Sequence, residues 1–152
     1  MIEKAVVSDS EILTEIAIQS KGYWGYTTEQ LESWRKDLTV SKEHLAEWEV
    51  YKFVDEKQIA GFYALGIDLK TQTACIEFLF VLPTWIGKAI GIQLLQHAFE
   101  NARSHNMRKI SVVSDPNAKN FYAKYGFREV ALEESSIPDR YLPVMEKILF
   151  ES

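Results

Sequence analysis

The spacing of apolar residues predicts three strands in the middle of this chain. β-branched and aromatic residues dominate the segments 48–54, 59–67 and 73–81, and the polar segments 55–57 and 68–71 separate them. Runs of this length joined by short polar turns are typical of an antiparallel β meander. The sequence therefore places a sheet at the centre of the fold.

Apolar residues recur with the period of an α-helix on both sides of this meander. Before it, a first strand over 2–7 leads through capping residues at 8–11 into a helix. A second helix over 28–38 and a shorter helical piece over 41–47 follow. After the meander, an amphipathic helix over 87–105 carries its apolar residues on one face.

The C-terminal part alternates strands with one more helix. A strand over 109–114 is separated from the strand at 73–81 by the long helix, so the two require a crossover and a parallel pairing. Residues 115–117 cap a following helix, and Gly126 ends it. Its predicted buried face consists of Ala118, Phe121, Tyr122 and Tyr125.

Two further strands, over 127–132 and 142–150, complete the predicted fold. The result is an α+β class, with a mixed, mostly antiparallel central sheet and helices on both faces. The absence of repeats and of Pro, Gly or Ser linkers predicts a single domain over 1–152.

Composition excludes several classes of function. A formal net charge of −5 without a dense basic tract disfavours nucleic-acid binding. No segment approaches the ~20 consecutive apolar residues that cross a bilayer, and 1–4 lacks the layout of a signal peptide, so neither a membrane nor export is expected. With Cys75 as the single cysteine, no intrachain disulfide forms, which fits a cytoplasmic location.

The segment 76–91 has the layout of an anion-binding site. A strand carrying Glu77 runs through a short turn into a helix start that holds the small residues Gly87, Ala89 and Gly91. The first turn of a helix presents backbone N–H groups without intrahelical partners, and small residues let an anion approach them. A Walker loop and a dinucleotide fingerprint do not fit the residues here. The alternative interpretation is that the glycines only shape the connection.

Two motifs in this order resemble the GCN5-related N-acetyltransferase (GNAT) family. Val81 to Gly91 is similar to the family pattern V-x-P-x-x-Q/R-G-x-G/A-x-G/A of the acyl-CoA diphosphate loop, and Ala118 to Phe127 matches A-x-x-F-Y-x-x-x-G-F. The order of predicted elements extends the resemblance to nearly the whole chain. Ile86 departs from the usual Gln or Arg, and Ala89 replaces the commoner Gly.

The resemblance implies a cytoplasmic acetyl-CoA-dependent N-acetyltransferase that transfers an acetyl group directly to a primary amine of a small molecule or peptide. In the family, backbone groups near Leu79 to Val81 hold the pantetheine arm and the thioester oxygen. Asn117 either hydrogen-bonds the pantetheine amides or only caps its helix. The residues implied in cofactor binding are Leu79, Phe80, Val81, Ile86, Gly87, Lys88, Ala89, Ile90, Gly91 and Asn117.

Glu77 and Tyr122 are the candidate catalytic residues. Strand alternation groups Glu77 with Cys75, Leu79 and Val81, and we expect desolvation on this apolar strand to favour a base that acts through water. Tyr122 is the match for a phenol that donates to the departing sulfur. The alternatives are a Glu77 on the polar side of an amphipathic strand and an ordinary core tyrosine at 122.

The irregular segments 22–27 and 135–143 are the predicted acceptor-binding walls. The candidates are Tyr23, Trp24, Tyr26, Trp34, Ser136, Arg140 and Tyr141. The alternatives are that Trp24 and Trp34 fill the core or a homodimer contact, and that Arg140 pairs with an acidic neighbour rather than with the acceptor.

Direct transfer needs no covalent intermediate and no metal. Cys75 is therefore read as a small buried residue, and His44, His97 and His105 lack the spacing of metal ligands. Two rival functions remain: a catalytically silent acyl-CoA-binding or regulatory module, and an interaction domain without a nucleotide site.

Overall fold

The computed structural model describes residues 1–135, 137 and 139–150. These residues form two units, each built from two segments of the chain. The first consists of Met1–Gly66 and Phe78–Ala98, and the second of Ile67–Glu77 and the residues from Phe99 onward. Strand β4 (Thr73–Val81) and helix α4 (Ile90–Ser104) each pass from one unit into the other.

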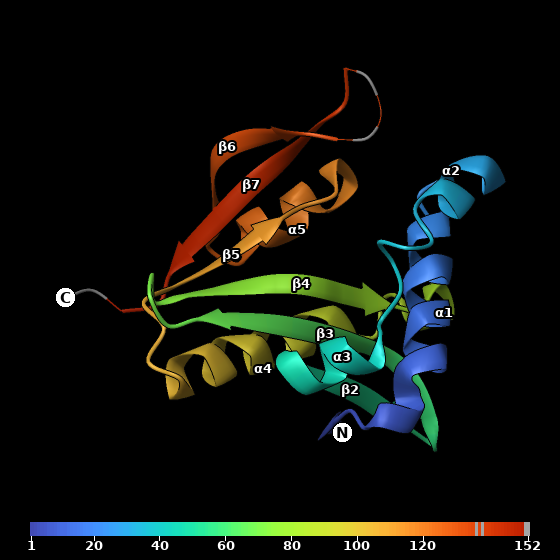
Figure 1. Cartoon of the computed structure of the whole chain (residues 1–152), viewed down its shortest axis with the longest axis horizontal. Coiled ribbons are helices and arrows are strands. Elements are labelled where there is room, and N and C mark those ends of the chain that lie inside the picture. Colours follow the sequence, from blue (N-terminus) through green and yellow to red (C-terminus); the bar gives the residue numbers. More distant parts are fainter. Residues whose placement is uncertain (136, 138, 151–152) are drawn as a thin grey trace. The chain divides into compact units, whose positions relative to one another are not determined.

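The first unit contains the N-terminal part of the sheet (Figure 1). Strand β1 (Ile2–Lys4) pairs antiparallel with β2 (Glu49–Asp55), and β2 pairs antiparallel with β3 (Gln58–Asp68). The meander predicted from the apolar runs is confirmed, and the bounds predicted for β4 agree with those observed.

Helices cover both faces of the sheet in the first unit. On one face, α4 approaches β3 closely: a Cβ added at Gly61 would lie 3.3 Å from Leu94 Cδ1 and 2.6 Å from the Phe80 carbonyl oxygen. On the other face, Phe78 packs against Phe62 and against Trp48, at the end of helix α3 (Lys42–Glu47). Gly61 is therefore required by the close approach of backbone and helix.

The three helices before β2 begin where the capping residues predict or close to it. Thr27 and Ser41 form capping boxes at the starts of α2 (Thr28–Ser33) and α3. Helix α1 spans Ser10–Gly22. Helix α2 ends at Ser33, before the predicted residue 38, and residues 34–38 continue as turns in which Leu38 N–H donates to the carbonyls of Trp34 and Arg35.

The first strand is shorter than predicted. β1 ends at Lys4, and a 3₁₀ turn η1 (Val7–Asp9) precedes α1. The Asp9 carboxylate makes no cap to α1. It accepts from the Val6 N–H at 2.8 Å and from Lys52 Nζ at 2.8 Å. These bonds hold the turn that follows β1 against β2.

The second unit contains the parallel pairing expected from the crossover. Strand β5 (Lys109–Val113) pairs parallel with β4 from Thr73↔Lys109 to Ile76↔Val112. Strand β7 (Tyr141–Ile148) pairs antiparallel with β5, and β6 (Arg128–Glu134) pairs antiparallel with β7. Among the described pairings β4–β5 is parallel and the others are antiparallel, so the mixed, mostly antiparallel α+β fold is confirmed.

The helix after β5 is shorter than predicted and begins later. A 3₁₀ turn η3 (Pro116–Ala118), capped by the Asp115 side chain, precedes the six-residue α5 (Lys119–Lys124). Of its predicted buried face only Tyr122 is buried, and the other three residues are half-buried. Gly126 ends the segment with φ +97°, as predicted.

The strands join in the order β1-β2-β3-β4-β5-β7-β6. In the described part of the chain, no helix has the length and apolar character needed to span a bilayer. The single domain over 1–152 stays a prediction.

Candidate active site

In the first unit, β4 extends past the last of its residues that are described as paired with β5. The described pairing with β5 stops at Ile76, whereas β4 itself runs to Val81. The Val81 carbonyl accepts from Ser20 Oγ at 2.9 Å, and Leu82 N–H donates to the Ala60 carbonyl at 2.8 Å. The end of β4 is thus anchored on β3 and α1.

The short turn predicted after β4 contains a regular element. A 3₁₀ turn η2 (Pro83–Trp85) follows β4, and Ile86 N–H donates to the Pro83 carbonyl at 3.3 Å. The Ile86 side chain is exposed. The resemblance implied Ile86 in cofactor binding, and its backbone N–H is engaged within the turn.

Gly87 and Ala89 both adopt the left-handed conformation, with φ +91° and +60°. A Cβ added at Gly87 would meet nothing within 4 Å, so glycine is needed there for its backbone angle rather than for space. Ala89 occupies a conformation that L-residues rarely adopt. Both residues are exposed.

Helix α4 begins at Ile90, which corrects the predicted start at Gly87. The Ala89 carbonyl accepts the first helical bond from Gln93 N–H at 3.3 Å and a second bond from Gln93 Nε2 at 3.0 Å. Alanine has no side-chain acceptor, so residue 89 cannot cap the N–H groups of the first turn, which includes Gly91. The exposed Lys88 places its ammonium over the Trp85 ring, 5.5 Å from the centroid.

In the second unit, Glu77 lies on the exposed side of β4. Its neighbours Ile76 and Phe78 are buried and Cys75 and Leu79 are half-buried, so the predicted alternation of sides is confirmed. Glu77 itself is exposed, whereas we had expected it to lie in apolar surroundings. The Cys75 thiol lies 3.1 Å from Ser111 Oγ on β5.

Tyr122, also in the second unit, is buried with 5% of its surface exposed. Its ring makes edge contacts with Phe121 and Phe127, with centroids 5.3 and 5.2 Å away. Burial raises the pKa of the Tyr122 phenol above its ordinary value, because the apolar surroundings disfavour the phenolate. The phenol therefore keeps its proton at neutral pH.

Arg140 and Asn117 share a partner, Asp115. Arg140 Nη2 lies 3.3 Å from Asp115 Oδ2, so Arg140 pairs with an acidic neighbour. The cap of η3 is Asp115 rather than Asn117: Asp115 Oδ1 accepts from both the backbone N–H and the Nδ2 of Asn117, each at 2.9 Å. Both partnerships are within the second unit.

The aromatic residues of the first unit separate into an exposed pair and a covered pair. Tyr23 and Trp24 are 54% and 44% exposed and touch edge to face at 5.4 Å. Trp34 is buried against Tyr26 at 4.9 Å, and Lys21 lies over both rings. Trp34 thus belongs to the core and Trp24 does not. Tyr141 is exposed, and Ser136 lies outside the described residues.

A model of the acetyltransferase (GNAT) domain matches residues 24–139, most of the chain. The chain belongs to this family. The match includes both motifs on which the resemblance rested. A comparison with curated proteins gives no match.

Solved structures share the fold of this GNAT protein. The PaiA N-acetyltransferase of Thermoplasma acidophilum, in complex with coenzyme A, is 24% identical, with a TM-score of 0.80 over 97% of this chain and 98% of that one. Ard1 of Thermoplasma volcanium is 22% identical, with a TM-score of 0.76 over 99% and 98%. The ribosomal-protein-S18-alanine N-acetyltransferase of Escherichia coli is 14% identical, with a TM-score of 0.75 over 100% and 95%.

Sequence reasoning missed two partners of the candidate residues in this GNAT chain. Lys21 contacts Tyr26 and Trp34 from the end of α1, and nothing in its sequence neighbourhood indicates this. Asp115 was expected only as part of a helix cap, yet it also binds Arg140. An acidic residue directly before Pro116 signals a cap, but it carries no signal for a long-range ion pair.

Proposed function

We propose that this GNAT protein transfers an acetyl group from acetyl-CoA directly to a primary amine of a small molecule or peptide. The proposal rests on the geometry of the segment from β4 to α4. It places an exposed Glu77 on a strand that leads into an exposed loop with left-handed residues at 87 and 89, followed by a helix start. This segment lies inside the region matched by the family model.

The loop supports binding of the coenzyme A diphosphate. Gly87 has open space around its Cα, and Ala89 offers no acceptor to the first-turn N–H groups of α4. These N–H groups carry partial positive charge, and the exposed Lys88 adds a full one. The chain therefore supplies backbone donors and one cation for an anion. Because the Ile86 N–H already donates to the Pro83 carbonyl, we take the backbone N–H groups of residues 87–91 as the donors to the diphosphate.

The end of β4 supports binding of the pantetheine arm. Leu79, Phe80 and Val81 lie beyond the described β4–β5 ladder, so their backbone groups on that edge are candidates for hydrogen bonds to the arm and to the thioester oxygen. The amide of Asn117 remains the candidate side chain for the pantetheine amides, positioned by its bonds to Asp115.

Glu77 is the proposed base. An alkyl ammonium has a pKa near 10, so it must lose a proton before its nitrogen can attack the thioester. An exposed carboxylate is in contact with water, which suits proton removal through an intervening water molecule rather than by direct contact. Glu77 would thus receive the proton while the backbone of β4 stabilises the oxyanion.

Tyr122 is the proposed acid for the leaving sulfur. Its raised pKa keeps the proton on the phenol until negative charge develops on the thiolate. Because a thiol has a pKa of about 8.5, complete proton transfer from this phenol is unfavourable, so its contribution is mainly a hydrogen bond to the sulfur. The proposed acceptor contacts are the exposed Tyr23 and Trp24 in the first unit and, separately, the exposed Tyr141 in the second, with Tyr26, Trp34, Ser136 and Arg140 as supporting candidates.

Release of free thiol from acetyl-CoA, measured with a panel of primary amines, tests the proposal. We expect thiol release that depends on the amine, together with an acetylated product of matching mass. Coenzyme A binding without amine-dependent release would contradict catalysis and favour the silent module. The left-handed Ala89 and the engaged Ile86 N–H are the observations that favour that alternative.

A further inference from the structure

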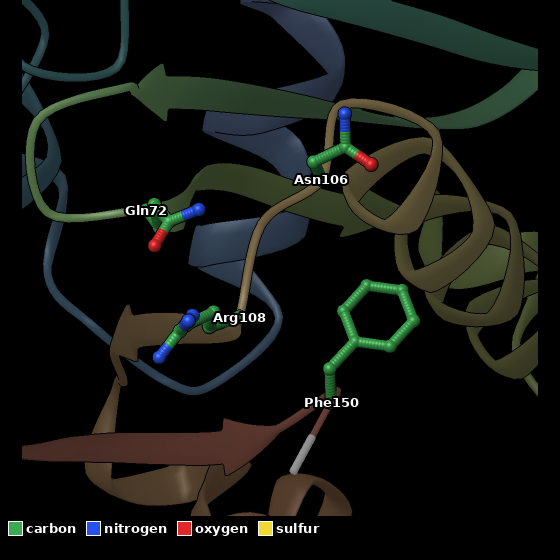
Figure 2. A pocket seen from close by; sticks show the side chains of 4 residues that line it. All are labelled: Gln72, Asn106, Arg108 and Phe150. Carbon is green, nitrogen blue, oxygen red and sulfur yellow. The ribbon is translucent and has the colours of Figure 1, made fainter. Parts of the chain in front are cut away.

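A pocket in the second unit lies where four chain segments meet (Figure 2). Its volume is about 270 Å³, and its lining residues are Gln72, Asn106, Arg108 and Phe150. Gln72 precedes β4, Asn106 follows α4, Arg108 precedes β5 and Phe150 follows β7. The pocket is slightly smaller than the range of about 300–1,000 Å³ typical of drug-sized ligands, which suits a smaller molecule.

Backbone hydrogen bonds centred on Arg108 hold this pocket together. Arg108 N–H donates to the Gln72 carbonyl at 2.8 Å. The Arg108 carbonyl accepts from Leu149 N–H at 2.7 Å and from Phe150 N–H at 3.2 Å. The backbone of Arg108 therefore holds the backbones of Gln72 and Phe150 on either side of residue 108, and these bonds do not depend on the guanidinium.

Two of the lining residues adopt the left-handed backbone conformation. Gln72 has φ +54° and Asn106 has φ +62°, where glycine would adopt the same angle without steric strain. The left-handed Asn106 ends α4: its N–H donates to the Arg103 carbonyl at 2.9 Å, and Met107 N–H donates to the Ala102 carbonyl at 3.0 Å. The left-handed Gln72 stands directly before β4. Here both side chains are amides that line the same pocket.

The charge of the pocket comes from Arg108. Among the described residues, no acidic side chain pairs with its guanidinium, and no lining residue is acidic. The neighbouring cations do have partners, because Arg103 pairs with Glu100 at 2.7 Å and Lys109 with Glu146 at 3.1 Å. The pocket thus combines an exposed guanidinium, two amides and the ring of Phe150, which is 45% exposed.

We propose that this pocket binds a small carboxylate with a planar body. A guanidinium matches a carboxylate with two parallel hydrogen bonds, and the amide of Gln72, which lies on the same side of the pocket in Figure 2, can donate to the same oxygens. The amide of Asn106 lines the opposite side of the pocket. The Phe150 ring offers an apolar surface on which a planar body packs. The site lies at the N-terminal ends of β4 and β5, whereas Glu77 lies farther along β4, at about 3.3 Å per residue. The inference therefore does not rest on acetyl transfer.

Titration of the isotopically labelled full chain with benzoate at low ionic strength tests this site. We expect the side-chain resonances of Gln72, Asn106 and Arg108 to shift with saturation by about 10 mM benzoate, and acetate to bind more weakly. Arg108→Gln should raise the dissociation constant at least tenfold, because a charge-assisted pair is lost. Phe150→Leu should remove the preference for benzoate over acetate.

Arg103→Gln is the matched control, because Arg103 lies near the end of α4 and already has an acidic partner. It should leave benzoate binding unchanged. The Arg108→Gln variant should fold, since the bonds that hold the pocket use the backbone of residue 108. The site is refuted by absence of shifts at these residues, by unchanged binding in Arg108→Gln, or by equal binding of acetate and benzoate.

Discussion

The guanidinium of Arg140 lies 3.3 Å from the carboxylate of Asp115, and only 18% and 10% of the two side chains are exposed. The other carboxylate oxygen accepts two bonds from Asn117. One acidic residue therefore links the β6–β7 connection to the turn that precedes α5, the helix that carries Tyr122. In the second unit, this carboxylate binds two of the candidate residues, Asn117 and Arg140.

Replacing Asp115 by alanine should destabilise the protein by about 2 kcal/mol, because the cap of η3 and the partner of a largely buried guanidinium are lost together. Asp115→Asn keeps an acceptor and should lose less. Denaturant unfolding measures both changes. Glu100→Gln is the control. The Glu100 side chain pairs with Arg103 but is 75% exposed, so this substitution should change stability little. Equal effects of Asp115→Ala and Glu100→Gln would contradict this role.

Ala89→Gly should stabilise the free protein, by up to about 1 kcal/mol, because glycine adopts φ +60° without the steric penalty of a Cβ. The gain is reduced by the greater freedom of glycine in the unfolded chain. We also expect coenzyme A to bind equally or more tightly, as measured by calorimetry. A clear loss of affinity would mean that the loop is misassigned.

Gly87→Ala makes the reverse substitution, glycine to alanine, two residues earlier in the same loop. Nothing lies within 4 Å of the added Cβ, but φ +91° is unfavourable for alanine. We expect a loss of about 1–2 kcal/mol in the free energy of unfolding. An unchanged stability would indicate that the loop relaxes to another conformation.

Glu77→Gln should lower turnover by about 100-fold or more while changing coenzyme A affinity little, because the amide cannot accept the proton of the amine. Steady-state rates and calorimetry on the same preparation separate the two effects. Raising the pH toward the pKa of the acceptor amine should restore part of the lost rate. Wild-type turnover in this variant would remove Glu77 from the mechanism.

His97 should make stability depend on pH on the acidic side. Tyr63, which is fully buried, places its hydroxyl 2.7 Å from His97 Nδ1, and burial lowers the pKa of His97 below its usual value near 6.5. A lowered pKa means that the unfolded chain binds the proton more readily. Stability is therefore present above about pH 6.5 and is lost as the pH falls.

Unfolding of wild type and His97→Asn between pH 7 and 5 tests this dependence. The wild type should lose more stability than the variant over this range, because asparagine does not titrate. Parallel curves would show that His97 does not contribute.

Local patterns predicted much of the fold, because capping residues and alternation act over a few positions. The helices predicted to begin at 28 and 41 begin at Thr28 and Lys42, and the alternation around Glu77 agrees with the observed burial. The parallel pairing of β4 and β5 followed from the need for a crossover. Helix caps and strand alternation are predictable because the residues that determine them lie within the same segment.

Features set by contacts distant in sequence could not be predicted in the same way. Asp9 binds Lys52 instead of capping α1, and Asp115 binds Arg140, although neither partner is near in the chain. The start of α4 at Ile90 depends on the left-handed backbone of Ala89, which no propensity assigns to alanine. The exposure of Glu77 could not be predicted for a similar reason, because it depends on what covers the strand.

Titration of the labelled protein with coenzyme A, followed through the backbone amide resonances of residues 87–91, tests the central claim most directly. The account predicts saturable shifts in these amides at millimolar coenzyme A or below, together with a rise in the melting temperature. Unchanged resonances and an unchanged melting temperature would contradict binding of the diphosphate at this loop, and with it the proposed acetyl transfer.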